Sequence, residues 1–235
     1  MSELLSERNG DTLTLTLNRP EKMNALSASL VDALLAEVEG AATSGVRLLV
    51  LKGEGRNFSA GFDFGGYEEQ SEGDLLLRFV RIEQLLQAVR HASFDTMALA
   101  HGKNFGAGVD LICSCARRVA EASSTFRMPG LGFGLVLGTR RYAERVGGAR
   151  ARSVLGDGVT FGAEEALSDG FLTALVARDD WAATIDAAGS KLTPYASGAL
   201  YRATCPDTRD QDLADLVTSA ARPGLKDRIA AYRAG

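Results

Sequence analysis

Strand-like and helix-like segments alternate along most of this chain, and that alternation limits the fold more than any other feature. Residues 12–17 read TLTLTL, a period of two that is typical of a half-buried strand. The dipeptide Asn9-Gly10 directly before them predicts a tight turn that pairs this strand with residues 4–7. Further strands are expected at 46–52, 96–100, 118–120 and 125–128, and helices at 27–45, 74–92, 109–116, 139–146, 149–155 and 163–168.

The connections between these segments are short and contain no proline-rich or serine-rich linker. We therefore expect one α/β unit over residues 1–180, because such an alternation packs helices against a sheet. Residues 181–235 are rich in alanine and charge, and they predict a helical C-terminal region. The boundary between the two regions, within 170–180, is weakly marked in the sequence.

Length and composition narrow the class of protein. A chain of 235 residues that is 46% hydrophobic can fill a sizeable core. Its 26 basic and 30 acidic residues give a net charge of -4, so no global field draws it to nucleic acid or an anionic membrane. The N-terminus lacks a signal-peptide pattern, no apolar run approaches the roughly 18 to 20 residues of a membrane span, and the three cysteines form no disulfide framework. We expect a cytoplasmic protein with no nucleic-acid or membrane partner.

Two small-residue turns carry the strongest chemical signal. The first is 60–63 (AGFD), which follows a strand, and the second is 106–108 (GAG), which opens a helix. Amide groups at a helix start lack intrahelical partners and are positively polarised. If the N–H groups of Phe62 and Ala107 converge on one oxygen, they form an oxyanion hole for an enolate or a tetrahedral intermediate. Turns with this spacing also occur for purely structural reasons.

Other chemistries find little support in the residue inventory. A histidine-based hydrolase would have to use His91, at a helix end, or His101, at a strand end, and both positions suit structural roles. Cys113 and Cys115 are separated by one residue and would point apart on a helix, so no metal site is expected. The dinucleotide fingerprint begun by Gly53-x-Gly55 fails, because Phe58 stands where glycine is required.

Three longer motifs occur in a fixed order, namely 18–26 (NRPEKMNAL), 58–63 (FSAGFD) and 102–110 (GKNFGAGVD). Shorter motifs follow at 126–129, 138–141, 155–157, 163–166 and 170–172. In this combination, from about residue 4 to 180, the chain resembles the crotonase superfamily, which is the enoyl-CoA hydratase/isomerase family. The C-terminal quarter resembles the family mainly in being helical.

The resemblance implies an α/β fold in which repeated ββα units form a spiral, with a helical C-terminal region that serves oligomer assembly, as a homotrimer or a dimer of trimers. It implies an acyl-CoA thioester as substrate and no cofactor or metal beyond that CoA. By position in the motifs, Phe62 and Ala107 would supply the oxyanion-hole N–H groups. The residues implied to bind substrate are Lys22, Asn24, Ala25, Ala60, Gly61 and Gly106, and Arg19 and Lys226 could pair with CoA phosphates.

The acid/base residues depart from the family pattern. Hydratases of this family use two glutamates, and the first position is occupied here by Asp110, a shorter carboxylate that could still transfer a proton. The second position is Gly130, which cannot activate water. Glu68 or Glu69 could substitute, although loop carboxylates are usually solvated. An enoyl-CoA hydratase is the main interpretation, and the alternatives are thioester hydrolysis, decarboxylation or carbon–carbon cleavage, a non-catalytic acyl-CoA binding protein, or a scaffold whose role lies in assembly.

Five aromatic residues could crowd the acyl pocket and favour small or flat acyl groups. They are Phe62, Phe64, Tyr67, Phe79 and Phe133. Each could equally belong to the core, and Phe79 fits the core better because it lies on the apolar stripe of the predicted helix 74–92. Asp63 is expected to hold its own turn through hydrogen bonds from its side chain to the backbone.

Overall fold

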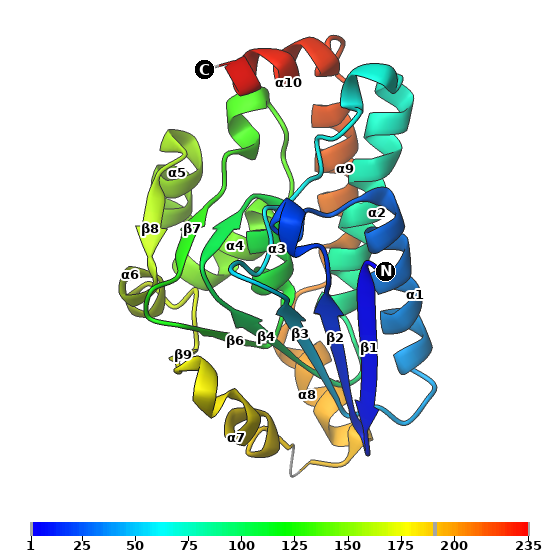
Figure 1. The fold of residues 1–235 in the computed structure, drawn as a ribbon, viewed down its shortest axis with the longest axis vertical. Coiled ribbons are helices and arrows are strands. Elements are labelled where there is room, and N and C mark those ends of the chain that lie inside the picture. The colour runs from blue at the N-terminus through cyan, green and yellow to red at the C-terminus, as the bar shows by residue number, and fades with distance from the viewer. Residues whose placement is uncertain (1, 190–191, 235) are drawn as a thin grey trace.

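A six-stranded, largely parallel sheet organises the molecule (Figure 1). The structure is a computed structural model that describes residues 2–189 and 192–234, and strand counts refer to these residues. The strand order is β1-β2-β3-β4-β6-β9, in which β1 and β2 are antiparallel and the remaining pairs are parallel. The strands are β1 Leu4–Asn9, β2 Thr12–Leu17, β3 Leu48–Gly53, β4 Asp95–Ala100, β6 Arg117–Ala120 and β9 Ala174–Leu175.

Both faces of the central strands are buried. Leu49 and Leu51 of β3 belong to the main core, whereas Leu48 and Val50 belong to a smaller apolar cluster that includes Trp181. Side chains alternate across a strand, so a strand covered on both faces reads as an unbroken apolar run, as 48–51 does. The helices that cover these faces include α1 Ala28–Ala41 and α2 Glu72–Arg90 on the main core, and α7 Trp181–Asp186 on the smaller cluster.

The first two helices begin at side-chain caps. The Ser27 hydroxyl accepts a hydrogen bond from Leu30 N at 3.1 Å, which confirms the predicted cap of α1. Helix α2 begins at Glu72, two residues before the predicted start. The reason is a capping box in which Ser71 accepts from Asp74 N and the Asp74 carboxylate accepts from Ser71 N.

A second, three-stranded sheet among the described residues lies beside the first, and it consists of β5 Lys103–Phe105, β7 Thr125–Arg127 and β8 Thr160–Gly162. Strands β5, β8 and the two-residue β9 were not expected from the sequence, because runs of two or three residues carry no readable period. The helices of this part are α3 Ala107–Ser114, α4 Thr139–Val146, α5 Gly148–Asp157 and α6 Ala163–Ser168. The bounds of α4 and α6 are those that the sequence predicts.

The C-terminal region is helical, as predicted, with α8 Pro194–Thr204, α9 Arg209–Ala220 and α10 Leu225–Ala234 after α7. Four side chains of α9 and α10, Leu216, Ala220, Leu225 and Ile229, are part of the main core. These two helices therefore pack on the α/β unit itself, and Figure 1 shows α9 running beside α2. Within the described residues no helix has the length and apolar character that crossing a bilayer requires.

Candidate functional site

The two small-residue turns lie against each other. Phe105 N donates to Ser59 O at 3.1 Å, and Leu26 N donates to Gly61 O at 2.7 Å. Gly61 has φ +79°, and a Cβ there would lie 2.3 Å from Phe105 O and 3.0 Å from Ala107 N. Only glycine fits this contact, so Gly61 is what lets the two turns meet.

The amides of Phe62 and Ala107 are both free. Across the described residues, neither N–H donates to a backbone carbonyl or a side chain, and both residues line one cavity. Ala107 is the first residue of α3, where amides carry the positive end of the helix dipole. Its φ is not positive, whereas its neighbour Gly106 has φ +46°. Alanine therefore meets the conformational demand at this position, and the positive φ falls on glycine.

The cavity has a volume of about 210 Å³ and is mainly apolar. Asp110 is the one carboxylic acid among the described residues that line it. Thr139 and Tyr232 add hydroxyl groups from α4 and α10. The other lining residues are Ala60, Phe62, Phe64, Phe79, Phe105, Gly106, Ala107, Met128, Pro129, Gly130, Leu131, Phe133, Leu135, Leu137 and Leu155.

Asp110 is held in an apolar environment in the first turn of α3. Its exposure is 3%, and Oδ1 has no hydrogen-bond partner. Burial raises the pKa of this carboxyl well above its ordinary value of 3.8, Arg141 opposes the rise, and Glu83 adds to it. Gly138, with φ +65°, lies so close that a Cβ would be 1.9 Å from Oδ1. The carboxyl is therefore confined, and its neutral form is favoured.

The structure offers no second carboxylate at the place where the family pattern has one. Gly130 lines the cavity, as its alignment with the motif predicts. Glu68 and Glu69 are exposed and do not line it, so the hypothesis that either one replaces the missing glutamate is wrong for this arrangement. The Glu68 carboxylate instead pairs with Arg233 at 3.3 Å. The Glu68 and Glu69 carboxylates stay at the surface because water stabilises their charge better than the apolar cavity would.

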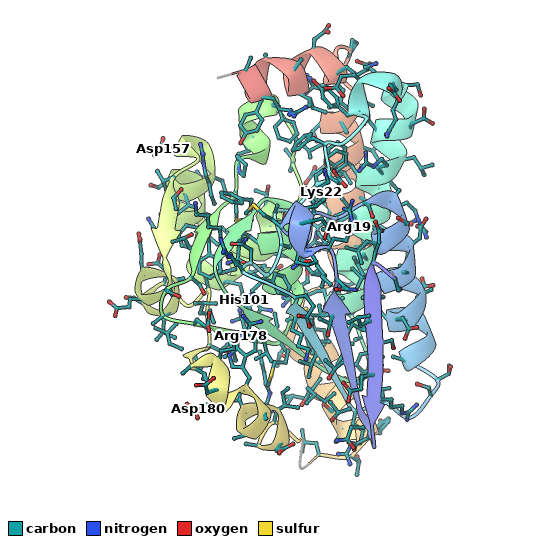
Figure 2. The ribbon with its side chains drawn as sticks, in the orientation of Figure 1. Arg19, Lys22, His101, Asp157, Arg178 and Asp180 are labelled. Carbon is teal, nitrogen blue, oxygen red and sulfur yellow. The ribbon has the colours of Figure 1, made fainter. Side chains whose placement is uncertain are left out.

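The basic residues near the first motif differ in availability (Figure 2). Arg19 is committed within the protein, because its guanidinium pairs with Glu3 at 2.8 Å and with Asp63 at 2.7 Å. The Arg19 guanidinium thus has two carboxylate partners within the protein, and its pairing with a CoA phosphate stays a prediction. Lys22 is exposed and has no ion pair among the described residues. Lys226 Nζ donates to Glu68 O at 2.5 Å.

Asn24 serves the backbone. Its side chain is fully buried, accepts from Arg19 N at 2.8 Å and donates to Glu54 O and Asn57 O, both at 2.8 Å. Both polar atoms of the Asn24 side chain thus bind the backbone of this chain, and its contact with substrate stays a prediction. Ala25 is buried beside it, while Ala60 and Gly106 line the cavity as the motifs imply.

The structural interpretations of the remaining residues hold in detail. Asp63 Oδ1 accepts from Gly65 N at 2.9 Å, which stabilises its own turn as predicted. His101 lies next to Trp181 with Nε2 3.1 Å from Gly55 O, and burial lowers its pKa, so its neutral form is favoured. Cys113 is a buried free thiol. Phe79 stacks on Phe62 with ring centroids 4.3 Å apart, so this core residue also forms the cavity wall.

Three residues of the site escaped sequence reasoning. Gly138 and Thr139 belong to the 138–141 motif, which by itself indicates no place at the cavity, and Tyr232 of α10 lies in the region that resembles the family least. The signal for Gly138 is its residue type, because a glycine directly before a helix often has a left-handed backbone and lets another group approach closely. Nothing in the sequence places Tyr232 at the cavity, since that contact depends on how α10 packs.

Comparisons with known proteins agree with this geometry. The family model of enoyl-CoA hydratase/isomerase matches residues 7–212. The chain belongs to that family. A crystal structure from Bordetella parapertussis, described as a "putative enoyl-CoA hydratase/isomerase", has 53% sequence identity to this chain and a TM-score of 0.98, and the match covers 99% of each chain. The "Probable enoyl-CoA hydratase echA6" of Mycobacterium bovis is 32% identical over 78% of this chain and 74% of its own.

A further relative is the 2,3-dehydroadipyl-CoA hydratase of Escherichia coli, with 32% identity over 74% of this chain and 69% of its own. Family membership confirms the crotonase-type fold and makes this protein an acyl-CoA-processing enzyme of the enoyl-CoA hydratase/isomerase family.

Proposed function

We propose that this enzyme stabilises the enolate of an acyl-CoA thioester and that Asp110 carries the proton steps. The observation that supports the proposal is the arrangement around one cavity of two free amides, of Phe62 and Ala107, with one buried carboxyl group. The thioester oxygen accepts hydrogen bonds from both amides, which stabilise the negative charge that develops on it. No metal or organic cofactor beyond CoA is needed, because the main chain polarises the carbonyl.

Hydration of an enoyl-CoA is the reaction we favour. Water adds at the β-carbon, and the electron pair of the double bond moves toward the thioester oxygen as the enolate forms. Asp110, neutral because it is buried, gives its proton to the α-carbon, and the added water returns a proton to the resulting carboxylate. One carboxyl group thus serves both steps that two glutamates share in the family pattern, and it ends in the state in which it began.

Decarboxylation of an acyl-CoA that bears a carboxylate on its α-carbon is the second candidate. It is favoured by the wall around Gly130, which is formed by apolar neighbours such as Leu131 and Leu135. A carboxylate in such a wall loses hydration, which promotes release of CO₂. The electrons of the broken carbon–carbon bond enter the enolate, Asp110 protonates the α-carbon, and a proton from solvent restores the neutral Asp110 carboxyl group. This reaction requires no base to activate water.

Products distinguish these reactions. The purified enzyme is incubated with a panel of enoyl-CoA and α-carboxyacyl-CoA thioesters, and masses are followed by mass spectrometry. Gain of one water with the thioester intact supports hydration, and loss of CO₂ supports decarboxylation. The Asp110→Asn variant is expected to lose turnover while it still binds thioester, whereas the exposed-site control Asp157→Asn keeps both. Free CoA as the main product, or equal turnover by Asp110→Asn, contradicts the proposal.

We further propose that the chain assembles as a homotrimer or a dimer of trimers in the cytoplasm. The helical C-terminal region and the family membership support this proposal. Sedimentation velocity measures the mass of the particle, and a monomer at micromolar concentration would contradict the assembly. Lys22 is the exposed cation that we propose for a CoA phosphate, and Lys22→Ala is expected to raise KM with little change in kcat.

A further inference from the structure

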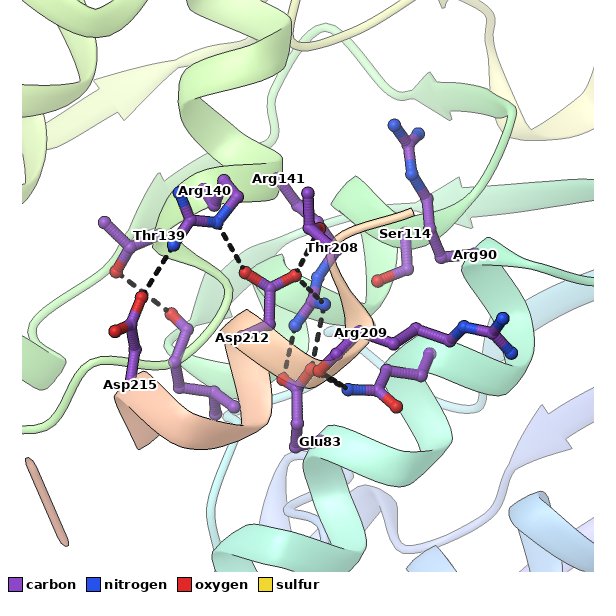
Figure 3. A network of polar contacts seen from close by, with 12 residues as sticks. Glu83, Arg90, Ser114, Thr139, Arg140, Arg141, Thr208, Arg209, Asp212 and Asp215 are labelled. Atoms are coloured by element: carbon purple, nitrogen blue, oxygen red, sulfur yellow. Dashed lines mark hydrogen bonds and ion pairs between the residues drawn. The ribbon is translucent and has the colours of Figure 1, made fainter. Parts of the chain in front are cut away.

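Helices α2, α4 and α9 share a network of charges that the proposed reaction does not use (Figure 3). Arg141 of α4 pairs with Glu83 of α2 through both terminal nitrogens, and one of them also reaches Asp212 of α9 at 3.1 Å. Glu83 and the Arg141 side chain are 1% and 3% exposed. The network therefore links three helices by ionic contacts that are screened from solvent.

Two buried polar atoms without hydrogen-bond partners relate this network to the candidate site. Asp110 Oδ1 is a buried acceptor without a partner, and Arg141 Nε is a buried donor without a partner. Arg141 and Asp110 are near enough to interact electrostatically. A free guanidinium close to a carboxylate would normally bind it, because charge-assisted pairs are strong. Here the terminal nitrogens of Arg141 are directed to Glu83 and Asp212 instead.

We propose that Glu83 is a positioning residue for Asp110. Together with Asp212, Glu83 holds the Arg141 guanidinium away from Asp110 and so keeps Asp110 protonated. This inference rests on the proposed role of Asp110 as proton donor. Glu83 contributes a negative charge that offsets Arg141, so the carboxyl at the cavity does not experience an unbalanced cation. Deprived of that counter-charge, Arg141 would stabilise the Asp110 carboxylate and withdraw the proton that the reaction needs.

The charged groups around Asp110 define the sign of the effect. Glu83 of α2 and Arg141 of α4 interact electrostatically with Asp110, and Cys113 is the neighbouring titratable group on α3 itself. Asp212 acts through Arg141. Removal of the Glu83 charge should therefore lower the pKa of Asp110, and removal of Glu83 and Arg141 together should bring it back toward the wild-type value.

The decisive experiment observes Asp110 directly. The side-chain carboxyl carbon of ¹³C-labelled aspartate is followed by NMR against pH, and the Asp110 signal is identified by its absence in Asp110→Asn. In Glu83→Gln the titration midpoint is expected to fall by roughly one pH unit, a tenfold loss of proton affinity. The Glu83→Gln/Arg141→Gln double variant should return it toward wild type. The base limb of the pH–rate profile should move in the same direction as the midpoint.

Two further variants make the result decisive. Asp215→Asn removes a charge from the exposed rim of the network, where Arg140 binds it, and is expected to leave the midpoint unchanged. Asp212→Asn, at a less buried site than Glu83, should lower the midpoint and serves if Glu83→Gln does not fold. An unchanged or raised midpoint in both Glu83→Gln and Asp212→Asn overturns the inference. The NMR midpoint does not depend on turnover, so failure of the proposed function remains distinguishable.

Discussion

Replacement of Gly138 by alanine is the sharpest structural test of how Asp110 is held. Gly138 has a left-handed backbone, which costs a residue with a Cβ about 1–2 kcal/mol. The new Cβ would lie 1.9 Å from Asp110 Oδ1, an overlap that must be relieved by movement. Overpacking of this kind typically costs about 1–3 kcal/mol.

These contributions predict a loss of about 2–5 kcal/mol in the free energy of unfolding. For a chain of this size the melting temperature falls by roughly 2–4 °C per kcal/mol, so a drop of about 4–20 °C is expected by calorimetry. If Asp110 rotates to relieve the overlap, the stability loss is smaller and the catalytic proton is misplaced. Turnover should then fall by about 100-fold or more, measured with the best thioester of the panel.

A matched control isolates the contact. Gly158 is also left-handed, with φ +59°, but a Cβ there meets nothing within 4 Å. Gly158→Ala should therefore show only the backbone cost and keep full turnover. In Gly138→Ala/Asp110→Ala the overlap with the carboxyl group is removed and only the Cβ of residue 110, at 3.1 Å, remains close, so the stability loss from Gly138→Ala should shrink. Equal behaviour of Gly138→Ala and Gly158→Ala in both assays would refute the reasoning.

Three further predictions follow from individual residues. Proline at position 107 removes one oxyanion-hole N–H and is compatible with the first turn of α3. Ala107→Pro should therefore keep the circular dichroism spectrum of the wild type and lose roughly 100- to 1000-fold in kcat. An unimpaired kcat would exclude this amide as a donor. Because folding raises the pKa of Asp110 above 3.8, its stabilising contribution is complete below about pH 4 and is lost as pH rises toward the folded-state pKa. Asp110→Asn should therefore gain stability relative to wild type as pH rises above about 4 in urea titrations, and a constant difference would contradict the raised pKa. Loss of the α1 cap in Ser27→Ala should cost about 1 kcal/mol without changing turnover, and an unchanged melting temperature would show that the cap contributes nothing.

Local signals in the sequence predicted most of the elements but not their long-range contacts. The TLTLTL strand, the first hairpin and the Ser27 cap each depend on neighbouring residues, and the structure confirms all three. The hairpin loop is Gly10-Asp11, one residue after the predicted turn, because Asn9 still pairs with Thr12. The short strand β5 has too few residues for a period, and it exists because β7 offers it a partner. Sequence patterns describe what a segment can form, whereas pairing decides the shortest segments.

The candidate site shows the same division. Phe62, Ala107 and Asp110 lie in recognisable motifs, and the structure places all three at one cavity. The ion pairs of Arg19 could not be predicted, because its partners Glu3 and Asp63 are distant in sequence. The burial of Glu83 and Arg141 could not be predicted from the sequence either, since a charged residue on a helix is ordinarily expected to face water.

The central claim is that two amides and one carboxyl group form and protonate a thioester enolate. The measurement that tests it most directly is exchange of the α-proton of a saturated acyl-CoA in D₂O, followed by mass spectrometry at a pH high enough to populate the Asp110 carboxylate. That carboxylate removes the α-proton and so forms the enolate that the two amides stabilise. We predict deuterium incorporation at the α-carbon by the wild-type enzyme, and strong loss of that incorporation in both Asp110→Asn and Ala107→Pro. Exchange that persists in both variants, or a wild-type enzyme that binds the thioester without any exchange, would contradict the account.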